Sequence, residues 1–102
     1  MTDQPAQIRA DALIIVRHAL KWEVPLARWQ VIAEILAALA AALDAADLDA
    51  VAEATIQLEL AAPVRITKIG ASSQPPPPPV RERLNELVYR LSDQDEAEDD
   101  GK

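Results

Sequence analysis

The segment PLARWQVIAEILAALAAALD, residues 25–44, decides the fold of this chain of 102 residues. Five large apolar residues in this segment recur at alternating intervals of three and four positions: Trp29, Ile32, Leu36, Leu39 and Leu43. This spacing places them along one face of an α-helix. Because the alanines beside them allow close approach of neighbouring helices, the pattern predicts a central, well-buried helix. It should start near Pro25 or Leu26 and reach about Leu43 or Asp44.

Amphipathic segments lie on both sides of this central helix. Apolar residues at helical spacing predict a first helix over about residues 5–22, which ends because the residue before a proline disfavours helical geometry. A third helix is predicted from Asp47, its N-cap, to about Leu60. With so short a link, the second and third helices should form an antiparallel hairpin. A fourth amphipathic helix is predicted over residues 80–91.

Other segments depart from the helical pattern. Val64 and Ile66 alternate with polar residues, so residues 64–69 are predicted to be extended, either lying over the helices or offering an edge to another protein. Residues 71–79 end in five prolines and predict a stiff polyproline spacer, with a ligand for an aromatic-lined groove as the alternative. Residues 92–102 carry six carboxylates and almost no apolar side chain, which predicts disorder.

The predicted fold class is therefore all-α, a small bundle of three to four helices in one domain. Its expected parts are a disordered N-terminus (1–4), a helical core with the extended segment (5–70), the Pro-rich linker (71–79), an amphipathic helix (80–91) and an acidic disordered tail (92–102).

Composition excludes several classes of protein. The formal net charge is −7, an acidic balance that argues against a nucleic-acid-binding protein. The chain has no cysteine, so it has neither disulfides nor a thiolate metal site. The longest apolar run, residues 35–43, is far shorter than the ~20 residues that span a membrane, and the N-terminus does not resemble a signal peptide. We therefore expect a soluble, cytoplasmic protein that binds neither nucleic acid nor membrane.

The sequence offers few residues for chemistry. His18 has no carboxylate within one helical turn and no cysteine to activate, so a structural histidine is favoured over a general base. Asp44, Asp47 and Asp49 lack the glycine and alternating ligands of a calcium loop, and helix capping is the favoured interpretation. Trp22 and Trp29 are interpreted as core packing rather than an interface. We predict no catalytic residue, no metal and no cofactor, and hence no enzyme.

Several blocks of the sequence together carry a family resemblance. They are Leu20–Glu23 with Pro25 and Arg28-Trp29, then Ala41–Asp47, then Leu58–Leu60 with Pro63–Gly70, and finally Pro77–Asn85 with Leu87-Val88. In this order, over about residues 8–91, the chain resembles the small proteins associated with CATRA (caspase and tetratricopeptide-repeat associated) conflict systems of bacteria. The resemblance implies an accessory subunit of a larger CATRA protein, in systems that couple caspase-like peptidases to defence or programmed death. Without cysteine, this chain is not itself such a peptidase.

These observations predict a non-enzymatic subunit that binds a larger protein partner, a CATRA-type or caspase-like component. Two surfaces are candidates for that contact, the extended segment and the apolar face of the fourth helix: Val64, Arg65, Ile66, Lys68 and Ile69, with Leu84, Leu87, Val88 and Leu91. Whether the fourth helix packs on its own bundle or on the partner is left open. The alternative function is an antitoxin-like inhibitory subunit whose acidic tail masks a basic surface.

Overall fold

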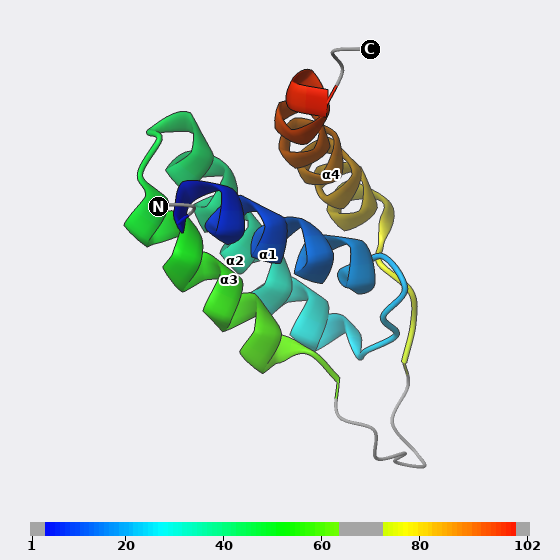
Figure 1. Cartoon of the computed structure of the whole chain (residues 1–102). Helices are drawn as coiled ribbons and strands as arrows, with labels where there is room; N and C mark the ends of the chain where they lie inside the picture. The colour runs from blue at the N-terminus through cyan, green and yellow to red at the C-terminus, as the bar shows by residue number, and fades with distance from the viewer. Residues whose placement is uncertain (1–3, 64–72, 100–102) are drawn as a thin grey trace.

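A computed structural model describes residues 4–63 and 73–99 of the chain, and the side chains of residues 6–63 and 73–92. It contains α1 (Gln4–Ala19), α2 (Leu26–Asp44), α3 (Leu48–Ala61) and α4 (Pro78–Asp99) (Figure 1). No β-strand occurs within these described ranges. The all-α prediction is therefore confirmed.

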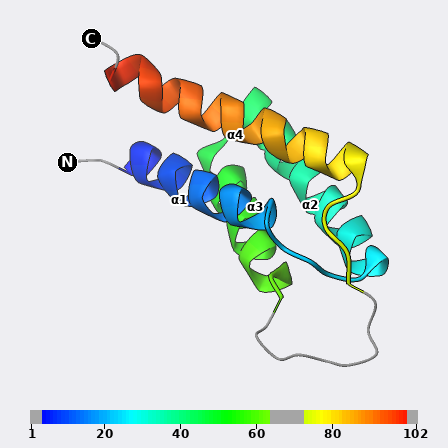
Figure 2. The ribbon, with the colours of Figure 1, turned by 90° about the vertical axis from the view of Figure 1, so that its right-hand side faces the viewer.

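The four helices form two layers. α2 and α3 make the predicted antiparallel hairpin, and α1 and α4 run antiparallel to each other across it (Figure 2). α1 contacts α3 and α4, while α2 contacts α3 and α4, so each helix packs against two others. The hydrophobic core lies between the layers.

The apolar row predicted within residues 25–44 lies in the core, but α2 as a whole is only partly buried, because its outer face is exposed. Trp29 is 1% exposed, and Ile32, Leu36 and Leu39 are fully buried. Burying a side chain of this size contributes about 1.5–3 kcal/mol. Leu43, the last residue of the predicted row, is only partly buried because it lies at the end of the helix.

The turn between α2 and α3 stops one helix and starts the next. The Ala46 N–H donates to the Leu43 carbonyl at 3.1 Å and the Asp47 N–H to the Ala42 carbonyl at 3.0 Å, the pattern of a Schellman motif. Ala46 has φ 55°, the left-handed conformation that this motif requires. The Asp47 carboxylate then accepts a hydrogen bond from the Ala50 N–H at 3.1 Å, which confirms Asp47 as the N-cap of α3.

We expect Ala46→Gly to stabilise the fold. An L-residue in the left-handed region costs about 1–2 kcal/mol, which glycine avoids while losing more freedom on folding, so the expected net gain is about 0.5–1 kcal/mol. Urea denaturation followed by circular dichroism measures it. The matched control is Ala45→Gly, where the backbone is right-handed at φ −88° and glycine should destabilise the fold. Equal effects of the two substitutions would contradict the assigned turn.

α1 ends three residues earlier than the sequence predicts. The predicted end at Trp22 is wrong because the helix stops at Ala19 and continues as tight turns, in which each N–H bonds to the carbonyl three residues before. The chain must unwind here, since Val24 precedes a proline and takes an extended conformation.

Val24 forms an isolated antiparallel bridge with Gln74. The Val24 N–H donates to the Gln74 carbonyl at 3.1 Å, and the Gln74 N–H donates to the Val24 carbonyl at 3.0 Å. The indole N–H of Trp29 also donates to the Gln74 carbonyl, at 2.8 Å. This bridge was not predicted, although both partners precede a proline and are thereby biased toward extended geometry. The bridge joins the segment before α4 to the residues just before α2.

The proline run is shared between the linker and α4. The linker was predicted to end at residue 79, but α4 begins at Pro78. The Arg81 N–H donates a helical hydrogen bond to the Pro77 carbonyl, four residues earlier, at 2.8 Å. Proline suits a first helical turn, where its missing N–H has no intrahelical partner to lose. The extended segment predicted at residues 64–69 lies outside the described residues.

α4 also continues beyond its predicted end at Leu91 and reaches Asp99. It therefore includes residues 92–99, which the composition assigned to a disordered tail. Residues 92–99 contain neither glycine nor proline, the strongest helix breakers, and the next glycine is Gly101. The low apolar content of residues 92–99 thus did not end the helix at Leu91.

Candidate functional site

The described part of the predicted partner-binding surface is buried within the bundle. Leu84 and Leu87 are 0% exposed and Leu91 is 3% exposed, while Val88 is half-buried. α4 packs on α1 and α2 of its own chain, so this face is covered in the isolated chain, and its binding to a partner stays a prediction. Its leucine side chains pack in the hydrophobic core of the same chain. The remaining predicted residues, Val64, Arg65, Ile66, Lys68 and Ile69, lie outside the described part of the chain.

α4 is also fixed by an ion pair. An Nη atom of Arg90 lies 2.7 Å from a carboxylate oxygen of Asp44, at the end of α2. Both side chains are partly solvent-exposed, so the pair orients the two helices more than it stabilises them. The arrangement answers the question that the sequence left open, because the fourth helix packs on its own bundle.

A different surface, on α2, exposes apolar residues to solvent. α2 is long and apolar enough to cross a membrane by length and composition alone, a property that core helices share. The nine-residue apolar run gave no sign of this, because Arg28, Gln30 and Glu34 interrupt the apolar sequence of the helix. Yet only 33% of its apolar stretch is buried in the molecule. More apolar surface is therefore present on α2 than the core covers.

Part of this surface forms a groove between α2 and α3. A pocket of about 330 Å³ lies there, lined by Ile35, Ala38, Ala50, Glu53, Ala54 and Gln57. Val31 precedes Ile35 by one helical turn and is 50% exposed, and Leu60 follows Gln57 by one turn and is 79% exposed. We call these eight residues the α2–α3 groove.

The two helices are held in register at one end of the groove. The guanidinium of Arg28, near the start of α2, donates to the Ala61 carbonyl at the end of α3, at 3.1 Å. Because the helices are antiparallel, this contact also places Val31 and Leu60 at the same end. The two exposed aliphatic side chains of the groove therefore lie toward the same end of the hairpin.

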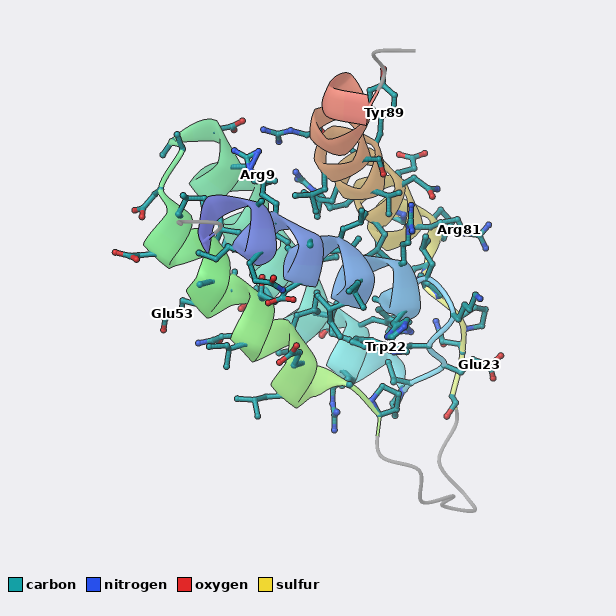
Figure 3. All side chains as sticks on the ribbon, in the orientation of Figure 1. Arg9, Trp22, Glu23, Glu53, Arg81 and Tyr89 are labelled. Carbon is teal, nitrogen blue, oxygen red and sulfur yellow. The ribbon has the colours of Figure 1, made fainter. Side chains whose placement is uncertain are left out.

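Negative charge borders the α2–α3 groove. Glu34 on α2 and Asp49 and Glu53 on α3 are exposed, and Glu53 points outward from the bundle (Figure 3). Arg28 is the one basic residue in α2 and α3, and its guanidinium bonds to the Ala61 carbonyl. The groove thus combines an apolar floor with an acidic border.

The sequence-predicted chemical candidates do not gather into a site. His18 is exposed in the last turn of α1, where a cation interacts favourably with the helix dipole. Asp47 caps α3, Asp49 lies in its first turn, and Asp44 pairs with Arg90. In residues 4–63 and 73–99, no group of three His, Cys, Asp or Glu side chains could hold a metal ion.

The two tryptophans take different positions. Trp29 lies in the core, as predicted, and its indole N–H is satisfied by the Gln74 carbonyl. Trp22 is partly buried and packs against the edge of the core. The α2–α3 groove was not predicted, because the alanines beside the apolar row of α2 were interpreted only as places where neighbouring helices approach closely. The available signal was the scarcity of charged residues over the whole circumference of α2.

Comparison with known proteins gives one result at the level of families. No curated protein and no solved structure matches the chain. The family described as CATRA-Associated Small Protein matches residues 11–95, close to the range of the resemblance seen in the sequence. Since this match covers most of the chain, the protein belongs to the family of CATRA-associated small proteins.

Proposed function

We propose that this chain is a non-enzymatic accessory subunit, which acts in the cytoplasm by binding a larger protein of a caspase-linked bacterial conflict system. Membership of the CATRA-associated family supports the link to such a system. The function of the subunit would then be contact rather than chemistry.

The observation that carries this proposal is the exposed apolar surface of α2 and α3. Val31 and Leu60 are highly exposed, and they lie beside an open groove lined largely by alanine and isoleucine. Monomeric proteins rarely expose contiguous apolar patches larger than a few hundred Å², and patches of that size mark protein interaction sites. A surface of this kind gains free energy when a partner covers it.

Co-expression with a larger CATRA protein from the same genome tests the proposal. We expect the two chains to co-elute in size-exclusion chromatography, with a mass by light scattering that equals their sum. A specific complex of this kind buries about 1,200–2,000 Å² in total. Separate elution of two folded proteins at micromolar concentration would contradict the proposed function.

A further inference from the structure

We infer that the α2–α3 groove is the docking site for one amphipathic helix of a protein partner, with aliphatic side chains on one face and Lys or Arg along its flanks. This inference rests on the proposed function and specifies where the contact is made. Three features of the groove lead to it: its shape, the state of its backbone and its charge.

The shape of the groove fits a helix. Ala38, Ala50 and Ala54 form a shallow floor between two antiparallel helices. Side chains this small let a third helix approach to the 8–10 Å interaxial distance of ordinary helix packing. The larger side chains of Val31 and Leu60 stand at one end, where they can contact aliphatic residues one or two turns apart on the partner.

The backbone of the groove also favours a helix over a strand. Both walls are continuous α-helices whose N–H and C=O groups bond within the helix. They offer no row of free backbone groups with which an extended peptide could pair. Recognition in the groove must therefore come from side chains.

The negative charge beside the groove favours a partner helix with basic residues on its flanks. Glu34, Asp49 and Glu53 are exposed beside an apolar floor, and the single base of the two helices, Arg28, donates to the Ala61 carbonyl at the groove's end. Lys or Arg beside the partner's aliphatic residues would complement these carboxylates. A second copy of this chain would instead bring the same carboxylates against each other, and an anionic membrane surface would repel them.

A pair of neighbouring substitutions tests the position of the contact. Ala38 and Ala37 are both exposed on α2, but only Ala38 lines the groove, since consecutive residues of a helix point about 100° apart. We expect Ala38→Glu to weaken binding to the purified larger CATRA protein at least tenfold in isothermal titration calorimetry, and Ala37→Glu to change it less than twofold. Circular dichroism verifies that both variants are folded.

Charge reversal tests the chemistry of the partner. We expect the double variant Glu34→Lys with Glu53→Lys to weaken binding and to reduce its dependence on salt, whereas Glu82→Lys on the exposed side of α4 leaves both unchanged. A photo-crosslinking amino acid at position 38 should attach to a helical segment of the CATRA protein that contains Lys or Arg beside aliphatic residues.

The outcomes separate this inference from the proposed function. If the wild-type chain does not bind the CATRA protein, both fail. If it binds but Ala38→Glu and Ala37→Glu have equal effects on binding, the groove is not the docking site, while the proposed accessory function is still supported. Crosslinking into an extended or acidic segment, dimerisation of this chain that Ala38→Glu abolishes, or groove-dependent binding to phosphatidylcholine or phosphatidylglycerol vesicles would each overturn the stated occupant.

Discussion

Replacing Trp29 with alanine should lower the free energy of unfolding by about 3–5 kcal/mol, the range for removing a large aromatic residue from a core. Trp29 is 1% exposed, and its indole N–H bonds to the carbonyl of Gln74 in the linker. The substitution thus opens a cavity and removes the hydrogen bond that joins α2 to the segment before α4. Because small domains are stable by only about 5–15 kcal/mol, this loss removes a large part of the total stability. Urea denaturation followed by circular dichroism measures the change.

Two companion variants separate the causes. Trp29→Phe keeps most of the volume but removes the indole N–H, and it should cost about 1–2 kcal/mol. The Gln74 carbonyl would then keep its bond from the Val24 N–H. Trp22→Ala, at a half-buried position, should cost less than Trp29→Ala. Equal losses at the two tryptophans would show that Trp29 is not the central anchor of the core.

Replacing Leu87 with alanine should lower the free energy of unfolding by about 2–5 kcal/mol. Leu87 is fully buried on α4, which packs against α1 and α2. Weakening this contact should also speed proteolysis of the linker, since α4 would detach more often. Tyr89→Ala is the matched control on the same helix, because this residue is 70% exposed and should change stability by less than about 0.5 kcal/mol.

The Leu87 experiment also distinguishes the two uses of the α4 face. A loss of stability in the isolated chain agrees with packing on its own bundle. An unchanged stability, combined with a loss of partner binding, would instead support the prediction that this face binds a partner.

Much of the fold could be predicted from the sequence because its determinants are local. The three-and-four spacing from Trp29 to Leu39 fixed the central helix, and the Asp47 cap fixed the start of α3. The family resemblance was also readable from short blocks of residues, and the match over residues 11–95 confirms it. Each of these signals lies within a few residues in the sequence.

The features that were missed depend on contacts between distant segments. The apolar row of Leu84, Leu87 and Leu91 shows that one face of α4 is buried, but the row is the same whether the covering surface belongs to this chain or to a partner. Only the packing on α1 decides between them. Similarly, Ile35 and Ala38 have helical spacing like core residues, and the groove becomes visible only when α3 is placed beside them.

The Val24–Gln74 bridge bears on the order in which the chain folds. It joins residues fifty positions apart, and closing a loop of that length costs entropy that only contacts already formed inside the loop can offset. The loop contains α2 and α3, whose hairpin contacts are much closer in sequence. We therefore expect the hairpin to form early and the bridge with α4 to close late, so substitutions in α4 should accelerate unfolding far more than they slow folding.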